Sequence, residues 1–154
     1  MCGIIGVYLK NITNQQLHQI SKLIMQSGIR GIHATGISYF KNNKVNTLSE
    51  HKSSSKFLIG KKLEDYTDDG NLYLIGHTRY STSDLKYNQP IGNNTMAISH
   101  NGVISQENPK LWNNIYNLET TTTNDSELIF ASLKANNGIV NCPMELFLRQ
   151  QKIF

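Results

Sequence analysis

Apolar positions along this chain fall into short runs, and the shortest of them predict β-strands. Residues 3–9 (GIIGVYL) are apolar at nearly every position. The run is too short for a helix of that hydrophobicity, so we expect a buried strand there. Residues 71–76 (NLYLIG) and 95–99 (TMAIS) are two further strand candidates, and each leads directly into a polar stretch.

A β-hairpin is predicted between these strands. Residues 36–40 (GISYF) and 44–48 (KVNTL) flank Asn42 and Asn43, and asparagine tolerates the backbone conformations that tight turns require. The next segment, 50–69, is polar and has no clear period. It is therefore not assigned to any element.

Two stretches have the period of an amphipathic helix. The first is expected to begin with Asn14 as its N-cap and to stop at Gly28. The second is expected to begin with Asn124 as its N-cap, with Glu127 completing a capping box, and to stop at Gly138. The apolar stripes consist of Leu17, Ile20, Leu23 and Ile24 in the first helix and of Leu128, Ile129 and Leu133 in the second.

The order of these elements predicts the fold class. A third, shorter helix is expected to start at Pro143. Strands and helices follow one another without a regular βαβ alternation, and this order favours an α+β fold. With 154 residues, the chain is expected to form one domain over residues 1–154.

The charge pattern argues against a nucleic-acid partner. The net charge of +4 comes from dispersed lysines, and a nucleic-acid surface would need a basic stripe with interleaved aromatic residues. We expect the densest lysine cluster to be a solvated surface; its members are Lys52, Lys56, Lys61 and Lys62.

The sequence also predicts the compartment and the state of the cysteines. No apolar run is long enough to span a membrane, and the first residues lack the basic and apolar regions of a signal peptide. We therefore expect a cytoplasmic protein without a membrane partner. Cys2 and Cys142 lie near opposite ends of the chain without the spacing of metal ligands. Both are expected to be free thiols, and no metal or other cofactor is expected.

Cys2 is the first candidate for chemistry because it directly follows Met1. Removal of Met1, which is favoured before a small residue, leaves Cys2 with both a thiol and an α-amino group. An α-amino group has a pKa of about 7.7–8.0, so part of it is neutral near pH 7 and accepts the thiol proton. The alternative is that Cys2 is only a small buried residue beside the terminus.

Further polar residues at the ends of apolar runs have both a chemical and a structural interpretation. His77 and Arg79 either lie in an ordinary loop or provide a guanidinium that binds a carboxylate. Asn101 and Gly102 either form a hairpin turn or donate hydrogen bonds to an oxyanion. Asp125 either stabilises a helix N-terminus or binds an ammonium group.

Taken together, these stretches resemble the class II glutamine amidotransferase domain, an N-terminal-nucleophile hydrolase, in order and in approximate spacing. The versions in amidophosphoribosyltransferase and glucosamine-6-phosphate synthase are the most similar. The resemblance covers residues 2–135 and leaves 136–154 unassigned. Its motifs are MCGIIGVY at the start, IRGIHATGIS at 29–38, IGHTRYSTSD at 75–84, QPI at 89–91, ISHNGVIS at 98–105 and TTNDSELI at 122–129.

The resemblance implies hydrolysis of the side-chain amide of L-glutamine through a Cys2 thioester, and delivery of ammonia to a synthase domain or subunit. It implies that Cys2 is the nucleophile and that Asn101 and Gly102 form the oxyanion hole. Arg79 and Asp125 would hold the carboxylate and the α-amino group of glutamine. Arg30 would order the site, and His77 and Thr82 would lie beside the substrate. The implied fold is a four-layer αββα sandwich.

The chain departs from the family in two positions and in length. His33 replaces a residue that is commonly acidic, and Ser83 replaces one that is often histidine. Family domains usually continue for several strands beyond the second predicted helix. We therefore expect a short or C-terminally truncated domain: a minimal version, a split product completed by a partner, or a decayed copy.

Two other functions stay open at this point. The chain could be a non-catalytic glutamine-binding or scaffolding relic of the same domain. It could also be an N-terminal-nucleophile hydrolase for another amide, although Arg79 and Asp125 favour an α-amino acid substrate.

Overall fold

The computed structural model describes residues 2–81 and 87–136 of the chain. These residues belong to two compact units, Met1–Asn101 and Gly102–Phe154, and each unit is described by itself. The predictions for Thr82, Ser83, Gly138, Cys142 and the helix from Pro143 lie outside the described residues.

The first unit is built on a four-stranded antiparallel sheet with the order β1-β4-β2-β3. The strands are β1 (Gly3–Leu9), β2 (Ala34–Lys41), β3 (Lys44–Glu50) and β4 (Leu72–Arg79). The predicted strand at 3–9 is confirmed, and the strand predicted at 71–76 continues to Arg79. The hairpin of β2 and β3 is also confirmed. Its turn residues Asn42 and Asn43 have φ angles of 55° and 59°, as a type I′ turn requires.

The long helix α1 (Asn14–Ser27) begins at Asn14, the residue that was expected to be its N-cap. Thr13 is the N-cap rather than Asn14, and its hydroxyl accepts a hydrogen bond from the N–H of Gln16 at 3.3 Å. The Gln16 side chain accepts from the N–H of Thr13 at 2.9 Å, which completes a capping box. The helix ends before Gly28, as predicted.

One residue of the predicted apolar stripe is wrong. Leu17, Ile20 and Ile24 are buried, but Leu23 is 47% exposed. At 100° per residue, Leu23 lies about 120° from Leu17 around the helix axis, beyond the edge of the buried stripe.

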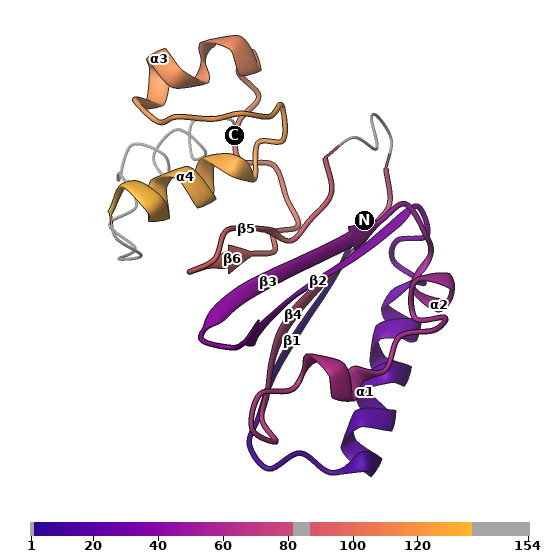
Figure 1. Cartoon of the computed structure of the whole chain (residues 1–154). Coiled ribbons are helices and arrows are strands. Elements are labelled where there is room, and N and C mark those ends of the chain that lie inside the picture. Colours follow the sequence, from indigo (N-terminus) through magenta and orange to yellow (C-terminus); the bar gives the residue numbers. More distant parts are fainter. Residues whose placement is uncertain (1, 82–86, 137–154) are drawn as a thin grey trace. The chain divides into compact units, whose positions relative to one another are not determined.

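The unassigned segment 50–69 contains two short helices, α2 (Ser54–Phe57) and η1 (Leu63–Tyr66). Together with α1 they cover one face of the sheet (Figure 1). The core of the unit lies between these helices and that face. Its most buried side chains are Ile37, Leu72 and Leu74 from the sheet and Ile24 and Phe57 from the helices.

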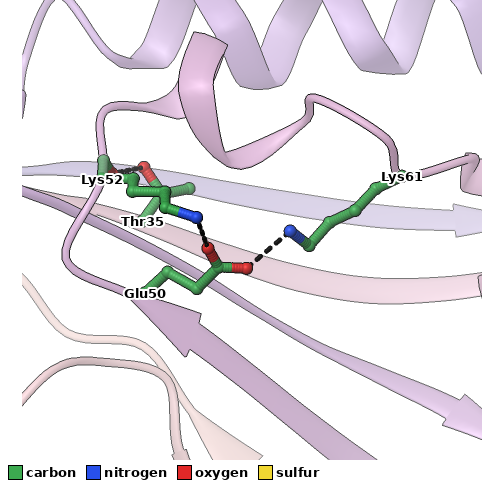
Figure 2. A network of polar contacts seen from close by, with 4 residues as sticks. All are labelled: Thr35, Glu50, Lys52 and Lys61. Carbon is green, nitrogen blue, oxygen red and sulfur yellow. Dashed lines mark hydrogen bonds and ion pairs between the residues drawn. The ribbon is translucent and has the colours of Figure 1, made fainter.

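Ion pairs connect the end of β3 to this helical segment (Figure 2). Glu50, the last residue of β3, accepts from Lys52 at 2.6 Å and from Lys61 at 2.5 Å. The two lysines hold the pKa of the Glu50 carboxyl below its usual value. The hydroxyl of Thr35 donates to the carbonyl of Lys52 at 2.9 Å, so the turn after β3 is also tied to β2. Two of the clustered lysines therefore have a structural role.

The opposite face of the sheet, which we call the far face, carries every second residue of each strand because side chains alternate along a strand. The rings of Tyr8 on β1 and Tyr73 on β4 meet there, with centroids 5.0 Å apart. Ile4 and Tyr8 are 51% and 71% exposed. The far face thus has accessible apolar side chains within the first unit.

A small hairpin follows β4 in the first unit. Its strands are β5 (Ile91–Gly92) and β6 (Ala97–Ile98), so the strand predicted at 95–99 is reduced to two paired residues. The N–H of Val45 on β3 donates to the carbonyl of Asn94 in the hairpin turn at 2.8 Å. The hairpin is thereby fastened to the edge of the main sheet.

The second unit contains η2 (Pro109–Leu111), α3 (Trp112–Tyr116) and α4 (Glu127–Ala135). Their core consists of Trp112, Leu118, Leu128 and Ala131. The helix α4 confirms the second predicted helix, whereas η2 and α3 were not predicted. They follow a polar stretch in which Asn108 caps the turn by accepting from the N–H of Lys110 at 3.0 Å.

The predicted start of α4 is wrong in the cap position and in the capping box, although Oδ1 of Asn124 does accept from the N–H of Ser126 at 3.1 Å. Ser126 occupies the N-cap position, and its side chain makes no capping hydrogen bond. The carboxylate of Glu127 does not reach back to Asn124. It accepts instead from the N–H and hydroxyl groups of Thr121 and Thr122, at 2.6–2.9 Å. Four donors in the preceding loop outcompete the single donor of a capping box.

The α+β class is confirmed, since every pair of neighbouring strands in the described residues is antiparallel and helices accompany the sheet. No helix within residues 2–81 and 87–136 is long and apolar enough to cross a membrane.

The two glycines on the far face give a matched test of the packing. A Cβ at Gly36 would lie 2.2 Å from the carbonyl oxygen of Gln89, whereas a Cβ at Gly6 would have no atom within 4 Å. We expect Gly36→Ala to lower the free energy of unfolding by about 1–3 kcal/mol. Gly6→Ala is expected to leave it unchanged or to raise it by about 0.5–1 kcal/mol. Urea unfolding of both variants measures this difference, and equal values would contradict the packing of Gln89 on β2.

Candidate active site

The antiparallel register places the start of β1 beside the end of β4. Gly3 pairs with Thr78 and Ile4 with His77, so the next position in this register sets Cys2 opposite Arg79. Because side chains alternate along a strand, those of Ile4, His77 and Arg79 point to the far face. Residues that are more than 70 positions apart in the sequence are therefore neighbours at one end of the sheet.

The contacts of Cys2 are consistent with this placement. Its backbone nitrogen donates to Oδ1 of Asn101 at 3.3 Å, and its Sγ lies 4.0 Å from the carbonyl oxygen of Tyr80. Cys2 is half-buried and Asn101 is exposed. The structure thus brings together Cys2 and Asn101, which the sequence had placed in one site, at a position that solvent reaches.

The orientation of the Asn101 amide has a chemical consequence. Oδ1 accepts from the nitrogen of Cys2, so the NH2 group is on the other arm of the same planar amide. This arm is a hydrogen-bond donor. The nitrogen of Cys2 is an amide while Met1 is attached and becomes the α-amino group once Met1 is removed.

Arg79 is the last residue of β4, and its guanidinium is anchored by the loop that precedes β5. Nη1 donates to the carbonyl of Tyr87 and lies 3.4 Å from Oδ1 of Asn88. On β2, the partner of Arg79 is Ala34. The guanidinium is half-buried and held in place, which limits the entropy that it would lose on binding a carboxylate.

His77 is buried in the sheet, with only 2% of its surface exposed. It lies between Ile4 on β1 and Gly36 on β2. Neither ring nitrogen has a hydrogen-bond partner among the described residues. Burial first, and the nearby charge of Arg79 second, lower the pKa of His77 to about 4. His77 is therefore neutral at pH 7, and it packs beneath the site as an uncharged ring.

Arg30 is exposed in the turn that follows α1, and its N–H donates to the carbonyl of Ser27 at 3.0 Å. The next residue, Gly31, packs against the backbone at the end of β4, where a Cβ would lie 2.4 Å from the carbonyl oxygen of Thr78. Arg30 thus directly precedes a close contact with the strand that carries Arg79.

His33 occupies a position where the resemblance leads us to expect an acidic residue, and the structure shows what it contacts. Its Nδ1 accepts from the N–H of Ser81 at 2.9 Å, and its ring packs on Tyr80 with centroids 4.9 Å apart. A neutral histidine can accept a hydrogen bond, as a carboxylate does. His33 therefore holds the backbone segment whose carbonyl faces the Cys2 thiol.

Gly102 and Asp125 belong to the second unit. Oδ2 of Asp125 accepts from the N–H groups of Ile104 and Ser105, at 2.5 and 3.4 Å. The observed role of this carboxylate is to order the loop that follows Gly102. Thr82, which was predicted to lie beside the substrate, is outside the described residues.

One contact of the site was missed by sequence reasoning. Oε1 of Gln89 accepts from the N–H of His100 at 2.7 Å, directly before Asn101. The signal available in the sequence is the QPI stretch at 89–91, which belongs to the resemblance without an assigned role. Residues 2–81 and 87–136 contain no group of three or more His, Cys, Asp or Glu side chains placed to bind a metal ion.

No protein-family model, no curated protein and no solved structure matches this chain.

The buried histidine predicts a specific dependence of stability on pH. In the unfolded chain His77 binds a proton below pH 6.5, whereas in the folded protein it does so only below about 4. Its contribution is fully present above pH 6.5 and falls as the pH decreases from 6.5 to 4, by about 3 kcal/mol in all.

We expect His77→Gln to remove this part of the acid destabilisation. Chemical unfolding at pH 7 and pH 4.5 gives the loss for each protein, and the other histidines contribute equally to both. If the two proteins lost the same free energy on acidification, His77 would not be buried in its neutral form.

Proposed function

We propose that this protein hydrolyses the side-chain amide of glutamine, with Cys2 as an N-terminal nucleophile. The observation that carries the proposal is the hydrogen bond between the Cys2 nitrogen and Asn101, at the end of a sheet whose register sets Cys2 opposite Arg79. A nucleophile with its own base, an amide donor and a carboxylate-binding cation are the parts that this reaction needs.

In the proposed mechanism, the α-amino group of processed Cys2 takes the thiol proton, and Sγ attacks the side-chain carbonyl carbon of glutamine. The carbonyl π electrons move to oxygen, and the NH2 group of Asn101 donates a hydrogen bond to this oxyanion. When the carbonyl re-forms, the C–N bond breaks and the ammonium group of Cys2 returns its proton to the leaving nitrogen. Water then attacks the thioester, which releases glutamate and restores the thiol.

Arg79 is proposed to hold the α-carboxylate of glutamine. A guanidinium has five N–H donors and binds a carboxylate in a bidentate manner. Its anchoring through Nη1 to the Tyr87 carbonyl fixes the direction of the group before substrate arrives. The roles of Gly102 and Asp125 in the oxyanion hole and in ammonium binding are proposed from the resemblance alone. So are the αββα sandwich and the delivery of ammonia to a synthase.

One observation favours the second candidate, a non-catalytic relic of the same domain. The guanidinium of Arg79 has structural partners in Tyr87 and Asn88, so the arginine could serve only to fasten their loop. The two candidates differ in what happens to glutamine and in the kinetic signature of Arg79 variants.

The nucleophile is tested directly by replacing Cys2. We expect the processed wild type to release glutamate and ammonia from glutamine, and Cys2→Ala to release neither above the uncatalysed rate, because the attacking atom is gone. Coupled detection of both products measures this, and intact-mass analysis verifies the loss of Met1. Equal release by both proteins would exclude Cys2 as the nucleophile. Retention of Met1 together with no release by the wild type would favour the relic.

The substrate clamp is tested at Arg79. We expect Arg79→Lys to raise KM for glutamine by about 10-fold or more with a smaller change in kcat, because lysine keeps the charge and loses the bidentate geometry. The matched control is Asn88→Ala, which removes a loop contact of the same guanidinium. Initial rates over a range of glutamine concentrations measure both constants. If Asn88→Ala raised KM as much as Arg79→Lys does, the arginine would act only by holding the loop.

A further inference from the structure

Gln89 is a buried polar residue that lies between the sheet and the segment carrying Asn101. Gln89 is only 7% exposed, and its Oε1 accepts from the backbone N–H of His100 at 2.7 Å. A neutral amide supplies an acceptor at a buried position without the cost of burying a charge. The bond therefore fixes the backbone of His100, directly before Asn101.

The backbone of Gln89 is itself fixed by the sheet. Gly36 on β2 approaches it so closely that a Cβ would lie 2.2 Å from the Gln89 carbonyl oxygen and 3.0 Å from Cδ of Pro90. Gly36 pairs with His77 and faces the same side of the sheet. Each end of the Gln89 residue is thus held: the main chain by β2 and the side chain by His100.

These contacts form a continuous path to the nucleophile. Gly36 admits the backbone of Gln89, the Gln89 side chain holds His100, and the next residue, Asn101, holds the nitrogen of Cys2 at 3.3 Å. Asn101 is exposed, and the described structure shows this one hydrogen bond for its side chain. An exposed side chain keeps a defined direction only if the backbone beneath it is held.

We propose that Gln89 is a positioning residue for the proposed reaction, and that it acts through His100 to aim the amide of Asn101. The inference rests on the proposed function, because it assigns Gln89 a role toward the Cys2 nucleophile. Gln89 does not touch the reacting atoms. Its effect is to keep the NH2 group of Asn101 where the oxyanion forms, which changes kcat and leaves the binding of glutamine nearly unaltered.

The test replaces Gln89 with methionine, which has a similar length and no acceptor for the His100 N–H. We expect Gln89→Met to lower kcat by about 10- to 100-fold, the loss typical of a catalytic group displaced by about 1 Å, and to change KM by less than about 3-fold. The control is Gln19→Met on the exposed side of α1, which is expected to leave both constants unchanged. Gln89→Glu retains an acceptor and is expected to recover part of kcat, because its carboxylate carries a burial cost that the neutral amide avoids.

A double-mutant cycle with Asn101→Ala separates positioning from a general loss of structure. If Gln89 acts through Asn101, Gln89→Met adds less than about 2-fold to the loss already caused by Asn101→Ala, because the group that it aims is absent. Two independent losses would multiply instead. Multiplied losses, or a kcat for Gln89→Met equal to that of Gln19→Met, would overturn the proposal.

Hydrogen exchange distinguishes failure of this inference from failure of the proposed function. The amide of His100 is expected to exchange about 10-fold faster or more in Gln89→Met than in the wild type, while the amides of β4 keep their rates. If the wild type does not hydrolyse glutamine, the proposed function fails and the exchange result alone decides whether Gln89 holds His100. Unchanged exchange at His100 would overturn the inference even if the wild type is active.

Discussion

The pairing of β1 with β4 is the constraint on which the rest of the first unit depends. It is a backbone ladder from Gly3 opposite Thr78 to Leu9 opposite Leu72. Because side chains alternate along a strand, this register decides which residues enter the core and which enter the candidate site. A shift by one residue would turn Ile5 out of the core and turn the neighbours of Cys2 towards α1. The same ladder therefore fixes both the stability of the unit and the position of its thiol.

At the end of the sheet that carries the candidate site, neighbouring segments pack closely against glycines instead of against larger side chains. Gly3, Gly31 and Gly36 each stand where a Cβ would come within 2.2–2.5 Å of another atom, in two cases a backbone atom. The space that they leave is taken by the backbone of β4 and by Gln89, so the polar segments reach the sheet without bulky residues between them. The side chains of Gln89 and His33 accept hydrogen bonds from the backbone of His100 and Ser81, and these bonds fix the segments that contact Cys2. The site is thus made of loops, but the loops are held by buried or half-buried side chains.

Charged side chains of the first unit hold the segments that follow β3 and β4 in place. Glu50, Lys52 and Lys61 form ion pairs that hold the segment after β3, in a network open enough to water that its contribution to stability is modest. The guanidinium of Arg79 donates to the carbonyl of Tyr87 and to the side-chain oxygen of Asn88, and these bonds tie the end of β4 to the segment before β5. A neutral His77 lies two residues before it on the same strand.

The sequence by itself determined the local elements, because their periods and turn residues are local properties. It predicted β1, the Asn42–Asn43 hairpin, most of α1 and α4, and the α+β class. It missed Thr13 as the cap of α1 and the engagement of Glu127 with Thr121 and Thr122, because several polar residues near a helix start compete for the same few donors. Only the tertiary structure decided that Cys2 meets Asn101 and that Gln89 holds His100, since these bonds join residues 99 and 11 positions apart. The physical reason is that a hydrogen bond between loops depends on the register of the sheet beneath them, and no pattern within either loop encodes that register.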